Sequence, residues 1–287
     1  MKGLKTDLVD PIDPVCPEDE RLSAKDLIRD HRPQIDAVRA GIANDPLYDA
    51  TKHDDLWIVR FVLSHKKKTK PAIAAAKATL EFRKEHNLDA EDIRSFAPHK
   101  VMEGRVKEYW DVRCPGNTLI VTIPNPKRGA IAFINMASMV QGTSEKLSYD
   151  TWEYAFIYTS EWTFQWLDYI TRTTGRFTRS IRLVNLKGIT LSTFSRKDLK
   201  FDGDVMGKME DCYPQLLETI YACNAPALIH AIWAVARAIV PKRVLEKFNI
   251  INPKQNQKER ETLYKHIAEE TLPVEHGGLN TVCPHEW

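Results

Sequence analysis

The chain has 287 residues, of which 43% are hydrophobic and 28% charged, and its 41 Lys and Arg against 39 Asp and Glu give a formal net charge of +2. A chain of this length buries about three quarters of its unfolded surface on folding, so one or two ordinary globular domains are expected. This composition excludes a disordered chain, and the near balance of charge argues against nucleic acid as a partner.

The cysteines and the N-terminal segment point to an intracellular protein. The five cysteines are scattered and form no Cys-x-x-Cys pair, which favours a reducing compartment. The N-terminal segment lacks the apolar core of a signal peptide, and no run reaches the ~18 apolar residues of a membrane span. We therefore expect a cytoplasmic protein.

The first third of the sequence predicts an arm followed by helices. Residues 1–22 carry prolines among acidic residues and predict an extended arm. Ser23 is the expected N-cap of a helix that runs to about Ile42, Asp54 and Asp55 open a second helix, and a third follows Pro71. Residues 23–97 are therefore expected to form a helical N-terminal subdomain.

From about Val106 the pattern changes to short β-branched runs. These runs predict strands at 119–123, 130–134, 181–184 and 219–223. Helical stretches are predicted at 148–171, 197–212 and 226–240. The alternation predicts an α/β domain over residues 98–287, with a mixed, largely parallel sheet.

The sequence contains no familiar catalytic or metal-binding motif. It has no phosphate loop, no Gly-x-Ser-x-Gly elbow and no His-Glu-x-x-His. Its nine histidines show no metal-ligand spacing, and His53, His65 and His86 are expected near helix ends, either solvated or as C-caps. We therefore predict that the protein is not an enzyme, with no catalytic residue, no metal and no cofactor.

The helix predicted within 225–240 (APALIHAIWAVARAIV) is unusually apolar. Its polar residues His230 and Arg237 share one narrow strip, so the helix must hide most of its surface. Two interpretations remain open: a buried crossover helix, or a mobile lid over an apolar cavity. The apolar residues concerned are Leu228, Ile229, Ile232, Trp233, Val235 and Ile239.

Several ordered segments resemble the CRAL-TRIO lipid-binding family, over about residues 53 to 280. They are CYPQLLETIYACNAP (212–226), the apolar helix after it, PKRVLEKFNII (241–251), LPVEHGG (272–278), WIVRFVL (57–63), Trp-Glu-Tyr (152–154) and Asn-Leu-Lys-Gly (185–188). The resemblance implies a hydrophobic pocket between a sheet floor and a mobile gate helix. It also implies binding or exchange of lipids such as phospholipids, tocopherol or retinoids.

From this resemblance we expect a protein that carries a hydrophobic ligand, foremost a phospholipid such as phosphatidylinositol or phosphatidylcholine, and exchanges it at a membrane surface. The alternative is a lipid-sensing regulatory module that presents its ligand to a partner such as a lipid kinase or another lipid-modifying enzyme. Tocopherol, retinoid and sterol remain open as ligands. A haem ligand is disfavoured, because Ser180 and Arg182 offer no good axial ligand.

The resemblance also implies residues for an inositol phosphate headgroup. A gap-free match places Gln215 at the family's Glu, Val244 at its Thr and Lys247 at its Lys. His65 and Lys66 fall at its basic pair. Gln215 lacks the charge and Val244 lacks the hydroxyl, which weakens the case for inositol. A phosphate held by Lys247 and Lys66 remains the expectation.

For a choline headgroup the resemblance implies Ser180, Arg182 and Tyr154. Side chains alternate along a strand, so Ser180 and Arg182 share one face. An inward Arg182 should hold an anion, such as a phosphate or carboxylate, or an internal acid. The alternative is a register slip of one residue, which turns Arg182 outward.

Overall fold

The computed structural model describes residues 7–11, 19–94, 96, 98–115, 121–124, 127–136, 139–190, 193, 195–209, 211–227, 229–237 and 242–281. Leu228 and Ile239 of the predicted apolar helix lie outside these residues. Residues 7–11 of the predicted arm contain no helix or strand and lie along the end of a long helix, where Val9 N–H donates to Arg172 O at 3.1 Å.

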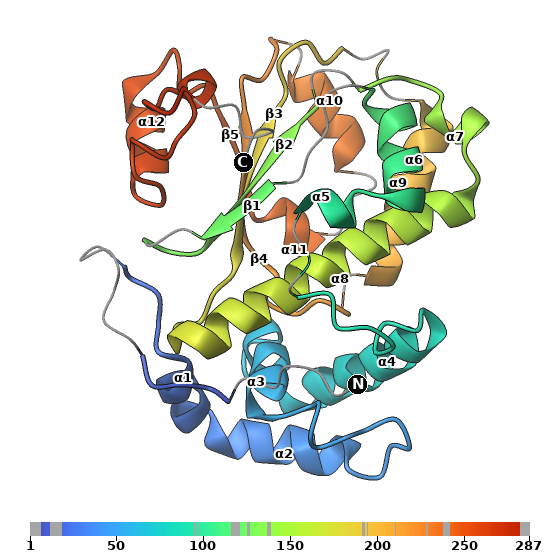
Figure 1. The fold of residues 1–287 in the computed structure, drawn as a ribbon, viewed down its shortest axis with the longest axis vertical. Coiled ribbons are helices and arrows are strands. Elements are labelled where there is room, and N and C mark those ends of the chain that lie inside the picture. Colours follow the sequence, from blue (N-terminus) through green and yellow to red (C-terminus); the bar gives the residue numbers. More distant parts are fainter. Residues whose placement is uncertain are drawn as a thin grey trace.

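Four helices form a unit at the bottom of Figure 1: α1 (Ala24–Asp30), α2 (Arg32–Ile42), α3 (Asp55–Ser64) and α4 (Thr69–Glu85). The predicted caps are confirmed, because Ser23 accepts from Asp26 N–H and Asp54 accepts from Trp57 N–H, both at 3.1 Å. A core that includes Ile35, Val59 and other buried side chains of all four helices holds the unit together.

The single helix predicted from Ser23 to Ile42 was wrong. The chain breaks at His31, which ends α1 and caps α2, and Pro33 is the second residue of α2. Proline has no N–H, and its ring would collide with the carbonyl group one turn earlier in a continuous helix. Pro71, in contrast, lies in the first turn of α4, where no N–H partner is needed.

A five-stranded sheet follows, in the order β1-β2-β3-β4-β5. The strands are β1 (Val121–Pro124), β2 (Ala130–Asn135), β3 (Ser180–Asn185), β4 (Leu217–Cys223) and β5 (Phe248–Ile251). Strands β2 to β5 are parallel and β1 is antiparallel to β2. The predicted fold class, α/β with a mixed and largely parallel sheet, is confirmed. The sequence analysis missed β5.

The long helix α8 (Tyr149–Thr174) runs between the helical unit and the sheet (Figure 1). Helices α6 (Gly104–Arg113) and α9 (Arg196–Met209) pack on its N-terminal half. The short α5 (Pro98–Val101) also contacts α8, and the short α7 (Thr143–Lys146) packs against α6 and α9. Ser148 caps α8, and Gly175 ends it at a φ of 66°. A Cβ at Gly175 would lie 2.6 Å from the arm backbone at Asp10, so glycine is required here.

The two faces of the sheet have different neighbours. Ile181 and Leu183 of β3 pack against a C-terminal segment that contains α12 (Gln257–Tyr264). Ala130 of β2, on the opposite face, packs with Ile157 and Leu167 of α8. Even-numbered residues of β3 therefore face the α8 side, which places Arg182 toward the interior between sheet and helices.

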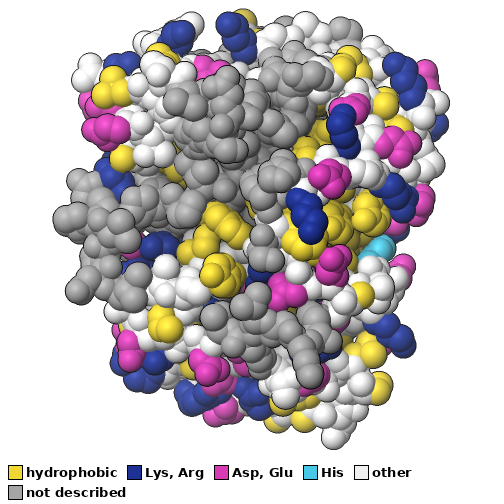
Figure 2. All heavy atoms as spheres, viewed as in Figure 1, with side chains coloured by type: hydrophobic (Ala, Val, Ile, Leu, Met, Phe, Trp, Pro, Cys, Tyr) yellow, Lys and Arg dark blue, Asp and Glu magenta, His cyan; other side chains and the backbone are white. Residues whose placement is uncertain are grey.

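The remaining elements are α10 (Ile229–Ala236), α11 (Lys242–Leu245) and the 3-10 helix η2 (Val274–His276). Within the described part of the chain, no helix combines the length and apolar character needed to cross a membrane. Basic and acidic side chains are interspersed over the face shown in Figure 2, in keeping with the nearly balanced composition.

Candidate functional site

A cavity of about 390 Å³ lies between the sheet, the end of α3, and helices α8, α9 and α11. Its apolar wall consists mainly of Phe156, Met206, Met209, Leu216, Ile220 and Phe248. Its polar residues include Ser64, His65, Lys66, Ser160, Arg182, Asp211, Gln215, Arg243, Glu246 and Lys247. A concave site with an apolar wall and a few polar groups is the usual form of a small-molecule site.

Arg182 projects into this cavity from the middle of β3, next to Ile220 of β4. Among the described residues its guanidinium group has no carboxylate partner, no hydrogen bond and no aromatic face. Burial alone lowers its pKa from the usual value, because a desolvated cation has lost hydration that nothing replaces. Because Arg182 lines the cavity, the alternative register, in which its side chain faces outward, is excluded.

Lys247 immediately precedes β5 and lines the same cavity. Its Nζ donates to the carbonyl oxygen of Leu217. Burial, reinforced by the positive charges of Arg179, Arg243 and Arg182, lowers the pKa of Lys247 to about 8. Arg182 and Lys247 thus repel each other, and neither has a carboxylate in contact among the described residues. Of the two carboxylates that line the cavity, Asp211 pairs with Arg243, and Glu246 is the other. The excess of cations favours an anionic occupant.

His65 and Lys66 lie at the end of α3, where the chain turns toward the cavity. His65 is the C-cap of α3, and its Nε2 lies 3.8 Å from Oδ1 of Asp211, which also pairs with Arg243. Burial lowers the pKa of His65, so its neutral form is favoured. The side chain of Lys66 is exposed, and its backbone adopts the left-handed conformation, with a φ of 51°.

Gln215 occupies the position where the resemblance implied a glutamate. Its amide is already engaged on both sides: Nε2 donates to Ser64 Oγ at 3.2 Å, and Oε1 accepts from Arg179 at 3.4 Å. Gln215 therefore ties the segment before β4 to the end of α3. Val244 also lines the cavity and adds an apolar side chain, without the hydroxyl of a threonine.

Two residues implied by the resemblance are not brought to this cavity. Ser180 shares the face of Arg182, as predicted, but is fully buried and does not line the cavity. Tyr154 is 38% exposed, stacks on Tyr158 and lies under the guanidinium group of Arg105. It lines a separate cavity of about 250 Å³ beside the segment after α4.

The apolar helix predicted as a gate corresponds to α10. Ile229 is buried in a small cluster with Ile189, and Trp233 packs edge-on against Phe248, with ring centroids 5.0 Å apart. Phe248 lines the cavity, so α10 touches the cavity wall through this ring pair. The side chains of Ile232 and Val235 lie outside the described structure.

The sequence analysis did not single out Met206, Met209, Asp211 or Arg243 as cavity residues. Asp211 immediately precedes the CYPQ segment, and Arg243 stands next to Val244, so proximity to the motifs was an available signal. For the two methionines the sequence offers no such signal, because it does not determine which side of α9 faces the cavity. In the described ranges, no group of His, Cys, Asp and Glu is arranged to hold a metal ion.

Comparison with known proteins agrees with this architecture. A family model for the CRAL/TRIO domain matches residues 126–278, which is more than half of the chain. The chain belongs to the CRAL/TRIO domain family. This is a family of lipid-binding and lipid-transfer proteins, and its members generally bind lipids rather than act as enzymes.

Two individual proteins illustrate the likeness. Patellin-4 of Arabidopsis thaliana is 35% identical over 83 residues, which is 29% of this chain and 15% of the length of Patellin-4. The crystal structure of Sfh5 superposes with a TM-score of 0.54 at 14% identity and covers 81% of each chain. At this identity the likeness to Sfh5 concerns the fold alone.

Proposed function

We propose that this CRAL/TRIO protein binds a lipid with an anionic headgroup, that a phosphate or carboxylate of the headgroup contacts Arg182 and Lys247, and that the lipid is exchanged at membranes. Arg182 carries the proposal, because its side chain is half-buried without a counter-charge among the described residues, and arginine is rarely withdrawn from water without one. The unpaired cation lies in a cavity whose other wall is apolar, which is the combination that an amphipathic anion requires.

The size of the cavity supports a mobile gate. A volume of about 390 Å³ lies near the lower end of the range of about 300–1,000 Å³ for drug-sized ligands, so a two-chain lipid requires the cavity to widen. The cavity wall at Phe248 is covered by Trp233 of α10, a half-buried ring on a short helix. Displacement of α10 would open this wall.

A basic segment at the cavity rim supports contact with a membrane. Lys66 lines the cavity, and the exposed residues Lys67, Lys68 and Lys70 continue from it. Near an anionic membrane surface each lysine contributes about 1 kcal/mol of attraction. The attraction stays local, because the net charge of the whole chain is only +2.

The direct test is to purify the protein, identify small molecules that co-purify by native mass spectrometry, and measure transfer of fluorescent lipids between vesicles. We expect an anionic lipid to co-purify and to be transferred faster than a zwitterionic one. Absence of both bound lipid and transfer would contradict the proposal. Binding with negligible transfer would instead support the regulatory-module alternative.

Two lysine variants provide a matched control. K247M removes an ammonium group from the cavity and should weaken binding of the anionic lipid. Lys242 lies five residues earlier on α11, is exposed and does not line the cavity, so K242M should bind the same lipid as the unmodified protein does. Equal affinities of the two variants would show that Lys247 does not contact the headgroup.

A further inference from the structure

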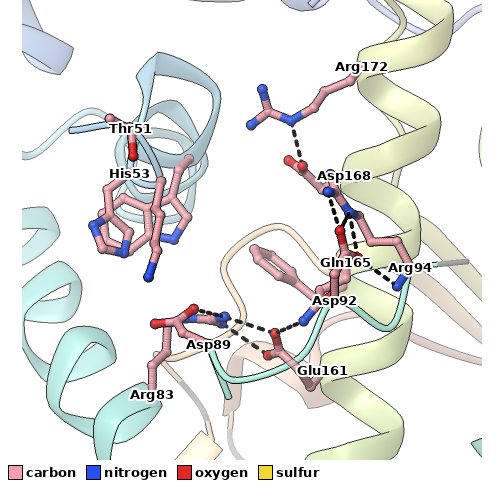
Figure 3. Close-up of a pocket in the computed structure, with 13 residues that line it drawn as sticks. Thr51, His53, Arg83, Asp89, Asp92, Arg94, Glu161, Gln165, Asp168 and Arg172 are labelled. Carbon is pink, nitrogen blue, oxygen red and sulfur yellow. Dashed lines mark hydrogen bonds and ion pairs between the residues drawn. The ribbon is translucent and has the colours of Figure 1, made fainter. Parts of the chain in front are cut away.

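A second cavity, of about 210 Å³, lies between the start of α3, the segment after α4 and the C-terminal half of α8 (Figure 3). It shares no lining residue with the lipid cavity. Its lining includes His53 and Trp57, the aromatic ring of Phe164, and several arginines and carboxylates. None of them was assigned a function by the sequence analysis.

The charges around this cavity balance. Arg83 bonds to both Asp89 and Glu161, Arg94 pairs with Asp92, and Arg172 pairs with Asp168. Lys52 adds one cation. Arg172 also pairs with the carboxylate of Asp54, which does not line the cavity. A strongly anionic or cationic ligand would meet like charges on several sides, so the cavity favours an uncharged occupant.

His53 leaves one hydrogen-bond donor without a partner. The side chain is 3% exposed, which corrects the expectation of a solvated or C-capping histidine. Burial lowers the pKa of His53 to about 4, so the ring is neutral. Nδ1 accepts from Asp49 N–H at 3.0 Å, so the single ring hydrogen is on Nε2. This buried Nε2–H has no partner among the described residues.

Free acceptors are also present at the cavity. Both arginine bonds of Asp89 end on Oδ1, and the bond from Arg172 to Asp168 ends on Oδ2. The other oxygen of each carboxylate has no hydrogen bond to the described residues. Trp57 and Phe164 supply aromatic surface in the same cavity. Aromatic rings and planar polar groups together suit a molecule with apolar C–H faces and several hydroxyl groups.

We propose that this cavity binds a neutral polyol of monosaccharide size, with one hydroxyl oxygen accepting the Nε2–H of His53. A hydroxyl group both donates and accepts, so the same molecule satisfies the histidine donor and the free oxygens of Asp89 and Asp168. The volume equals that of about seven waters at roughly 30 Å³ each, which accommodates one sugar ring. The proposal is independent of the lipid, because the two cavities have no residue in common.

Ligand-detected saturation-transfer NMR on the full chain tests the proposal. The probes are glucose and myo-inositol, each at millimolar concentration, with glucuronate and glucosamine as charged counterparts. We expect saturation transfer to at least one neutral compound and a markedly weaker signal from the charged ones. Absence of transfer to both neutral probes, or equal signals from the charged pair, would overturn the proposal.

Two substitutions of the same histidine separate its two ring nitrogens. H53N keeps an acceptor where Nδ1 bonds to Asp49 but removes the donor in the cavity, whereas H53Q keeps a donor near the position of Nε2. We expect H53N to weaken binding about tenfold, the effect of one lost hydrogen bond, and H53Q to retain most of it. Thermal denaturation establishes that each variant is folded. Equal loss in both folded variants would refute the role of Nε2–H, and the unmodified protein decides the question even if one variant does not fold.

Discussion

Replacing Arg182 by methionine tests the lipid site most directly. A hydrogen bond to a charged group contributes about 1.5–3 kcal/mol, and each 1.4 kcal/mol is a factor of ten in affinity. R182M should therefore weaken binding of an anionic lipid about 10- to 150-fold. Methionine has a similar length and suits the apolar wall formed by Met206 and Ile220.

The same substitution should stabilise the lipid-free protein. The pKa of Arg182 is lowered in the fold, so the fold disfavours the charged form relative to the unfolded chain. Removing that charge raises the free energy of unfolding. Arg179 is the matched control, because its guanidinium group pairs with Glu218 at 3.5 Å and bonds to Gln215. R179M should lower stability slightly, or leave it unchanged, and cause a smaller loss of affinity.

The assay combines urea denaturation of delipidated protein with titration of anionic-lipid vesicles. The expected pattern is higher stability with a large loss of affinity for R182M, and unchanged or slightly lower stability with a smaller loss of affinity for R179M. A loss of stability in lipid-free R182M would mean that Arg182 has a counter-charge within the protein. Unchanged affinity would mean that the headgroup lies elsewhere. Either result refutes the reasoning.

Four further expectations concern other residues. Because the pKa of Lys247 is about 8, affinity for an anionic lipid should fall as the pH rises from about 7 to about 9, and K247M should remove this dependence. Its folded-state pKa lies below the usual 10.5, so unfolding takes up a proton and stability should rise between pH 8 and 10.5, measurable by urea titration. W233D should abolish lipid exchange between vesicles, whereas unchanged exchange would show that α10 is not a gate. R83M leaves the buried Glu161 without its partner and should lower the free energy of unfolding, measured by urea denaturation, by about 3–5 kcal/mol. K107M is the control: it removes an exposed ion pair and should lower the free energy of unfolding by less than about 1 kcal/mol.

The sequence predicted those parts of the fold whose signals are local. Ser23 and Asp54 cap helices as expected, because a side-chain oxygen one turn before an apolar run satisfies a free N–H. Strands β1 to β4 were found from their β-branched residues. Strand β5 was missed, because Phe248–Ile251 is short and begins directly after a charged helix that masks its pattern.

The site was predictable where strand alternation or a motif fixed the residue. Alternation placed Ser180 and Arg182 on one face, and the structure agrees. Ser180 nevertheless lies under α8 and not in the cavity, since lining depends on how helices cover the sheet. Tyr154 lies away from the cavity because it faces another side of α8: two residues turn a helix by about 200°, so Phe156, which lines the cavity, projects from the opposite side.

The second cavity could not be predicted, because it depends on contacts between distant segments. His53 and Trp57 come from the start of α3, and Asp168 comes from more than a hundred residues later. A histidine before a helix is usually solvated, and only the packed structure shows that His53 is buried with one nitrogen unpartnered.

Two buried arginines, compared with the half-buried Arg182, show why the chemistry of Arg182 points to a ligand. Arg83 is neutralised by Glu161 and Asp89, which raise its pKa despite burial. Arg60 is fully buried without an ion pair, and its pKa falls to about 10. It lies over the rings of Phe164 and Phe177, 5.3 and 4.8 Å from their centroids, so aromatic faces partly replace its hydration.

Arg182 has neither of these solutions among the described residues, yet it lies in the largest apolar-walled cavity described for this chain. Replacing a cation that has neither a carboxylate partner nor an aromatic face by a hydrophobic residue of similar size should increase the stability of the folded protein. Its presence is therefore explained most simply by a counter-charge that arrives with the ligand. Stability and function then oppose each other at this position, as they commonly do at binding sites.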